Sequence, residues 1–132
     1  MLDSDTLELV REILAAAHDK KAFDVTALDV SGLTSFTDAF VLCSTSSDRH
    51  LDAVATEIRK RLKSQRKPLH IEGSGGGQWV LIDFADVIVH VFTEERRAFY
   101  NLEGLWGDAP LIEDQTDGAG IQGAAVDIEG EL

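Results

Sequence analysis

The longest apolar stretch of the chain, residues 78–92 (QWVLIDFADVIVHVF), predicts two strands joined by a tight turn. Its Val, Ile, Phe and Trp side chains favour a pleated surface over a helix. Asp83 and Asp86 bracket two residues, a pattern typical of a turn between strands. We therefore predict strands over residues 78–83 and 86–92. Because both faces of these strands are apolar, we expect them near the middle of a sheet covered by helices.

Three further segments predict the remaining strands, over residues 25–30, 38–44 and 69–72. The second of them is apolar at four successive positions, which again indicates a central strand. The glycine-rich residues 73–77 (GSGGG) lead from the third into the hairpin, and we interpret them as a flexible link.

Apolar residues at helical spacing predict three helices, over residues 6–17, 48–65 and 94–105. Asp5 is the expected cap of the first helix, and Glu8 three positions later gives a capping-box arrangement. The expected inner face of this helix is Leu7, Val10, Ile13, Leu14 and Ala17.

Hydroxyl side chains are the expected caps of the other two helices, Ser46 or Ser47 for the second and Thr93 for the third. The element order αββαβββα predicts an α/β (α+β) fold in which helices cover a mixed five-stranded sheet. The expected inner-face residues are Leu51, Val54, Ala55, Ile58 and Leu62 in the second helix, and Phe99, Leu102 and Trp106 in the third.

Acidic residues are concentrated towards the C-terminus of this 132-residue, single-domain chain. Residues 107–132 hold seven of the 24 Asp and Glu residues and none of the 12 Lys and Arg residues. We predict a folded domain over residues 1–112 and a disordered, acidic, Gly-rich tail over residues 113–132. The net charge of −12 argues against a generic duplex-binding protein and favours a basic protein as the partner.

One basic cluster stands out against this acidity, at the end of the second predicted helix. It has two interpretations, a solvated face that complements the helix dipole or a secondary contact to RNA phosphate. The cluster comprises Arg59, Lys60, Arg61, Lys63, Arg66 and Lys67.

Cys43 is the only cysteine, which excludes an intrachain disulfide and a cysteine metal cluster. Its apolar strand predicts a buried, inert thiol. Together with the lack of a secretory signal pattern, this favours a cytoplasmic protein. The aspartates of the hairpin argue against a membrane span, so we expect no membrane association.

Several motifs resemble ligand sites only in part. A phosphate loop must lead into a helix, but the glycines of residues 73–77 lead into a strand, so we interpret them as a hairpin loop. His50, His70 and His90 lie on a helix and two strands without accompanying ligands, which favours structural or hydrogen-bonded histidines over a metal site. We expect neither a cofactor nor a metal.

The serines before the second helix raise the idea of a nucleotidyltransferase. In that superfamily a Gly-Ser turn precedes a helix, and two carboxylates on the next strand bind metal. Here Thr45 takes the glycine position, and the next strand offers only Glu72. Two-metal catalysis therefore lacks a ligand, and we predict that the chain is not an enzyme.

Trp79 opens the central hairpin beside the glycines. Glu72, Asp83 and Asp86 lie close to it in sequence, and an aromatic residue with neighbouring acids is typical of a binding hot spot for a basic partner. The alternative is a core tryptophan covered by a helix, and the residues themselves leave both open.

The motifs taken together resemble the ribosomal silencing factor RsfS, or Iojap, family. The resemblance covers about residues 4–112 and rests on their combination. The motifs are DVTALDVSGLTSFTDAFVLCSTSSDRHL at 24–51, HIEG at 70–73, QWVLIDFADVIVHVF at 78–92 and EERRAFYNLEGLWGDA at 94–109.

This resemblance implies a nucleotidyltransferase-like fold without catalysis. It also implies binding to the large ribosomal subunit through ribosomal protein number fourteen of that subunit, which blocks joining of the small subunit and represses translation when nutrients are scarce. The family's partner-binding tryptophan matches Trp79. Strand alternation puts Leu81 and Asp83 on the same face, and we add them to the site with Glu72 and Asp86.

Two residues depart from the family pattern. Ala85 stands in the hairpin turn and Thr45 in the strand-to-helix turn, where glycine is usual; a positive φ would cost Ala85 about 1 kcal/mol. The competing hypotheses are a degenerate nucleotidyltransferase with residual nucleotide binding and a homodimeric adaptor unrelated to ribosomes. The family is often seen as a homodimer, and the sequence leaves the oligomeric state open.

Overall fold

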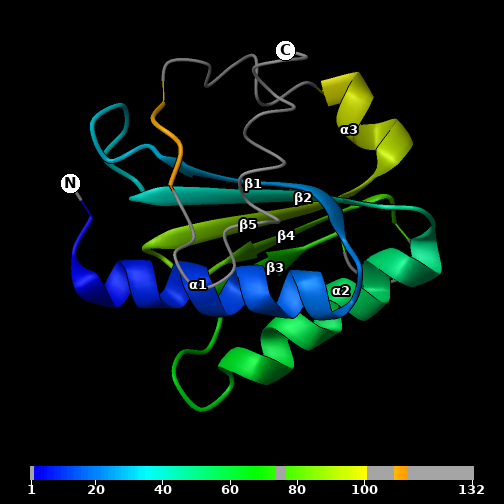
Figure 1. Cartoon of the computed structure of the whole chain (residues 1–132), viewed down its shortest axis with the longest axis horizontal. Coiled ribbons are helices and arrows are strands. Elements are labelled where there is room, and N and C mark those ends of the chain that lie inside the picture. Colours follow the sequence, from blue (N-terminus) through cyan, green and yellow to red (C-terminus); the bar gives the residue numbers. More distant parts are fainter. Residues whose placement is uncertain (1, 74–76, 101–108, 113–132) are drawn as a thin grey trace.

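The computed structural model describes residues 2–73, 77–100 and 109–112, and the side chains of residues 98–100 are outside that description. Within these residues the predicted element order is confirmed (Figure 1). The elements are α1 (Ser4–Asp19), β1 (Phe23–Asp29), β2 (Ala39–Thr45), α2 (Asp48–Leu62), β3 (His70–Glu72), β4 (Trp79–Asp83), β5 (Val87–Thr93) and α3 (Glu94–Tyr100).

The predicted mixed five-stranded sheet is confirmed, with strand order β1-β2-β5-β4-β3. The central pair β2 and β5 is parallel, and the other three pairs are antiparallel. Every residue of β2 and β5 is buried, as expected for central strands. The same expectation is wrong for β4, where only Val80 and Ile82 are buried and the alternate residues are partly exposed.

Helices α1 and α2 cover one face of the sheet, and Figure 1 shows them together beneath the strands. The predicted inner face of α2 is confirmed at all five positions, because its buried residues are those at helical spacing. Ser47 caps α2, accepting a hydrogen bond from the His50 backbone N at 3.1 Å. The helix ends at Leu62 rather than at residue 65, because the chain tightens there into a turn, in which the Gln65 N–H donates to the Leu62 carbonyl at 2.9 Å.

The predicted cap of α1 is wrong. The helix starts at Ser4, so Asp3 is the cap and accepts a hydrogen bond from the Thr6 backbone N at 2.8 Å. Asp5 lies in the exposed first turn instead. Leu9 is buried in the core, whereas the predicted inner-face residue Leu7 is only partly buried.

The second face of the sheet carries a smaller apolar cluster around Phe40, Leu42 and Phe92. The segment 109–112 lies along β1, where the Ile112 N–H donates to the Ala27 carbonyl at 2.8 Å. Helix α3 lies on this side of the sheet, opposite α1 and α2 (Figure 1). The buried Arg97 of α3 donates a hydrogen bond to Ser44 Oγ at 3.0 Å.

Two sequence predictions fall outside the described residues. The extension of α3 to residue 105, with its contacts from Phe99, Leu102 and Trp106, cannot be compared with the structure, and neither can the acidic tail over residues 113–132. Among the described helices, none combines the length and apolarity needed to span a membrane.

Candidate partner-binding face

The register of the hairpin gathers a row of aromatic and polar side chains on the face away from α1 and α2. Trp79 lies opposite Phe92, and Leu81 opposite His90, in the β4–β5 ladder. On the other side of β4, Leu81 lies opposite Glu72 of the edge strand β3. Residues directly opposite each other share one face of a sheet. We call this surface the Trp79 face; it comprises His70, Glu72, Trp79, Leu81, Asp83, His90 and Phe92.

Trp79 is half-buried and held in a defined orientation. Its ring lies against Phe92 with centroids 5.2 Å apart, and against His90 at 5.8 Å. Its indole Nε1–H donates a hydrogen bond to His90 Nδ1 at 3.2 Å. The tryptophan is therefore neither fully buried nor a loosely attached surface side chain. An oriented, partly exposed indole is suited to anchoring a partner, because little side-chain entropy remains to be lost.

His90 positions the indole. Its ring is buried, lies edge-on to Phe40 at 5.4 Å between centroids and stacks with Phe92. Burial lowers the pKa of His90 to about 4, because the charged imidazolium would lose its hydration. The neutral ring accepts the Trp79 hydrogen bond through Nδ1.

The sequence predicted a hydrogen-bonded histidine at position 90 but not its partner. Alternation along β5 puts His90 on the face of Phe92, and the hairpin register then brings it beside Trp79. That register was the signal that could have identified the contact.

Four residues are expected around Trp79. Glu72, Leu81 and Asp83 lie on its face, and Asp86 does not. Glu72 is exposed on the edge strand, where it contacts His70 Nε2 at 2.7 Å. Asp83 lies on the same face and also accepts a hydrogen bond from the Ala85 backbone N at 2.7 Å. Asp86 is separate, because its carboxylate pairs with Arg66, which follows α2, at 3.4 Å.

Ala85 lies in the hairpin turn with a backbone conformation that is unusual for alanine. Its φ is +76°, so the residue adopts the conformation that favours glycine. The Thr37 hydroxyl donates to the Ala85 carbonyl at 2.9 Å, which, with the Asp83 contact, holds the strained turn. Thr45, the second departure from the family pattern, lies in β2 and is not among the described non-glycine residues with positive φ.

The glycine segment before β4 is constrained where it meets Trp79. Gly73 has a φ of +84°, and a Cβ atom built there would lie 2.0 Å from the Trp79 carbonyl oxygen. A side chain would displace the backbone that carries the indole. Gly73 is therefore required because its backbone lies too close to the Trp79 carbonyl for a side chain to fit. The segment leads into β4 rather than into a helix.

The other candidate ligands lie apart from one another. His50 contacts the Lys20 carbonyl at 2.7 Å, whereas His70 lies on β3 and His90 beneath Trp79. Among the described residues, no group of three His, Cys, Asp or Glu side chains is arranged to hold a metal ion. Cys43 is buried, as predicted, and burial raises its pKa to about 12.

Comparison with known proteins identifies relatives over most of the chain. The family model described as "Ribosomal silencing factor during starvation" matches residues 3–128 and so extends past residue 112. Ribosomal silencing factor RsfS from Halalkalibacterium halodurans is 43% identical over 80% of this chain and 92% of its own length.

Two solved structures share the fold. A crystal structure from Bacillus halodurans has a TM-score of 0.72 at 40% identity and covers 81% of this chain and 98% of that one. A crystal structure from Chromobacterium violaceum has a TM-score of 0.74 at 34% identity and covers 76% of this chain and 85% of that one. With a family match over nearly its whole length and relatives at this level of identity, the chain belongs to the RsfS family of ribosomal silencing factors.

Proposed function

We propose that this protein silences ribosomes by binding the large subunit through the Trp79 face. The contact is made with ribosomal protein number fourteen of that subunit, and the bound protein keeps the small subunit from joining. Translation is thereby repressed when nutrients are limited. The family description and the names of the relatives support this proposal.

The oriented indole of Trp79 is the observation that carries the assignment of the face. Interface hot spots are enriched in tryptophan that packs in a well-ordered setting. Trp79 meets this description, since its ring packs against Phe92 and His90 while the residue stays half-buried. Leu81, on the same strand and face, extends the apolar centre of the contact.

Charge sets the kind of partner. Glu72 and Asp83 flank the indole on β3 and β4, so the rim of the face is acidic. An acidic rim accelerates association with a basic protein and disfavours acidic competitors. Asp86 contributes to the surrounding negative potential rather than to the face itself, because it is paired with Arg66.

The proposed mechanism is steric and involves no catalysis. A standard protein interface buries roughly 800 Å² on each partner, which one face of a small domain can provide. A domain held at the joining surface occupies the space that the other subunit needs. The protein works in the cytoplasm, where the ribosomes and a reducing environment for Cys43 are found.

Co-sedimentation with separated ribosomal subunits tests the proposal. The wild-type protein is expected to pellet with large subunits and to reduce the yield of joined ribosomes when small subunits are added. Trp79→Glu should weaken binding by about 30- to 1,000-fold, because losing a central tryptophan costs about 2–4 kcal/mol. Leu33→Glu is the matched control, since Leu33 is an exposed leucine in the loop after β1.

Binding of the folded Trp79→Glu variant with wild-type affinity would remove the indole from the interface. Normal subunit joining in the presence of saturating wild-type protein would reject the steric mechanism itself. A circular dichroism spectrum of each variant establishes that it is folded.

A further inference from the structure

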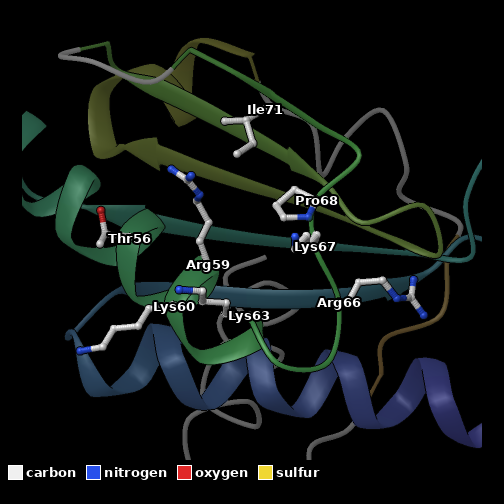
Figure 2. Close-up of a pocket in the computed structure, with 8 residues that line it drawn as sticks. All are labelled: Thr56, Arg59, Lys60, Lys63, Arg66, Lys67, Pro68 and Ile71. Atoms are coloured by element: carbon white, nitrogen blue, oxygen red, sulfur yellow. The ribbon is translucent and has the colours of Figure 1, made fainter.

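The strongest unassigned feature is a basic hollow between the end of α2 and the edge strand β3. Its volume is about 660 Å³. Figure 2 shows its lining side chains on α2, on the segment that leads into β3 and on β3 itself. They are Thr56, Arg59, Lys60, Lys63, Arg66, Lys67, Pro68 and Ile71.

The charge of this hollow is opposite to that of the protein. Five of the chain's 12 Lys and Arg residues line it, and its lining includes no carboxylate, although the net charge of the chain is −12. A neighbouring hollow against the same helix differs, because its cations Lys20, Arg49 and Lys60 are accompanied by the carboxylates Asp52 and Glu57. The first hollow thus gathers cations without carboxylates in its lining, on a molecule that is acidic as a whole.

Ion pairing distinguishes the hollow from an ordinary solvated helix face. Arg61, also near the end of α2, contacts both Asp19 and Glu57. By contrast, Arg59, Lys63 and Lys67 are exposed and form no ion pair with any other described residue. Figure 2 shows Arg59 reaching from α2 towards Ile71 and Arg66 pointing away, towards its partner Asp86.

The helix dipole accounts for only part of this arrangement. It favours cations in the last turn of α2, where Arg59 and Lys60 lie. It does not explain Lys67, which lies beyond the helix, on the chain segment leading into β3. Two separate segments therefore converge to place cations around one depression.

We propose that this hollow, the basic groove, binds the phosphate backbone of RNA on the large ribosomal subunit. Unpaired Arg and Lys side chains neutralise phosphates and release counterions, which is the main source of sequence-independent nucleic-acid affinity. The groove contains no aromatic side chain on which a base could stack. The contact is therefore to phosphate and positions the protein without reading sequence.

The position of the groove fits this partner and rests on the proposed function. Ile71 of β3 faces the α2 side of the sheet and packs against the main core, whereas its neighbour Glu72 lies on the Trp79 face. The edge strand thus separates an acidic, aromatic surface from a basic one. A basic ribosomal protein bound to the first surface and the adjoining RNA bound to the second would then contact opposite faces of β3.

Fluorescence anisotropy with a labelled 20-base-pair RNA duplex tests the groove directly. The test variant is Arg59→Gln, Lys63→Gln and Lys67→Gln combined. The matched control is Lys20→Gln, Lys21→Gln and Arg49→Gln combined, which removes the same charge outside the groove cations. All six residues are exposed, so both variants should fold.

The groove variant should lose at least about tenfold in affinity for the RNA duplex at low salt. Its slope of log Kd against log salt should fall by about 2, because each lost phosphate contact lowers the slope by about 0.7–0.9. The control should change affinity by less than about threefold. Equal losses in both variants would show a net-charge effect and overturn the proposal. Stronger competition by poly-glutamate than by unlabelled RNA would assign the groove to an acidic protein instead.

A second arm separates this inference from the proposed function. Trp79→Glu should leave the affinity for the RNA duplex unchanged while reducing co-sedimentation with large subunits. The groove variant should weaken co-sedimentation mainly at low salt, where the lost phosphate contacts contribute most to binding. If Trp79→Glu still pelleted with large subunits while the groove variant lost affinity for the RNA duplex, the Trp79 face would be excluded as the interface. The assignment of the groove to RNA would be retained.

Discussion

Lowering the pH from 6.5 towards 4 should destabilise this protein, because His90 is buried in its neutral form. The folded state holds His90 neutral, and burial lowers its pKa from 6.5 to about 4. In the unfolded chain the ring takes up a proton near its ordinary pKa of about 6.5. The unfolded state therefore binds more protons between these values, so the stability is complete above pH 6.5 and declines as the pH falls towards 4.

The magnitude follows from the shift. One pKa unit corresponds to about 1.4 kcal/mol, so the free energy of unfolding should fall by about 1.4 kcal/mol between pH 7.5 and 5.5 and by about 3 kcal/mol by pH 4. The rings in contact with His90 are those of Phe40, Trp79 and Phe92. The same protonation would also remove the acceptor of the Trp79 hydrogen bond, because both nitrogens of an imidazolium are donors.

Urea denaturation at several pH values between 7.5 and 5 measures this effect. His90→Asn is the comparison, because its side-chain oxygen can replace Nδ1 as an acceptor but does not titrate. The variant should be less stable at every pH, since the ring stack is lost, but its curve should lack the His90 slope. Parallel curves for the two proteins would refute the assignment of this pH dependence to His90.

The hairpin and the glycine segment offer two further predictions, both measured by thermal denaturation. Ala85→Gly should stabilise the protein by about 1 kcal/mol and raise Tm by about 4 °C, because the positive φ is relieved; a lower Tm would show that the turn is not strained. Gly73→Ala should destabilise it by about 2–3 kcal/mol and weaken co-sedimentation with large subunits, because the added Cβ would collide with the Trp79 carbonyl. An unchanged Tm would contradict the close approach at Gly73.

Local patterns in the sequence determined the elements and their buried faces. Residues at helical spacing face one side of α2, and all five of its predicted core residues are buried. Alternation along β4 put Trp79, Leu81 and Asp83 on one face, and their partial exposure confirms it. These inferences succeeded because the helical and strand periods depend on neighbours within a few residues.

The tertiary structure alone decided which segments meet. Nothing local indicates that β2 pairs in parallel with β5, far along the chain, or that Asp86 turns to Arg66 and away from Trp79. The same holds for His90 as the acceptor that orients the indole. Such partners are selected by the packing of the whole sheet, where each strand satisfies its backbone hydrogen bonds and buries its apolar side chains at once. The sequence therefore determined that an indole would stand on one face of a hairpin, and only the assembled sheet decided what supports it.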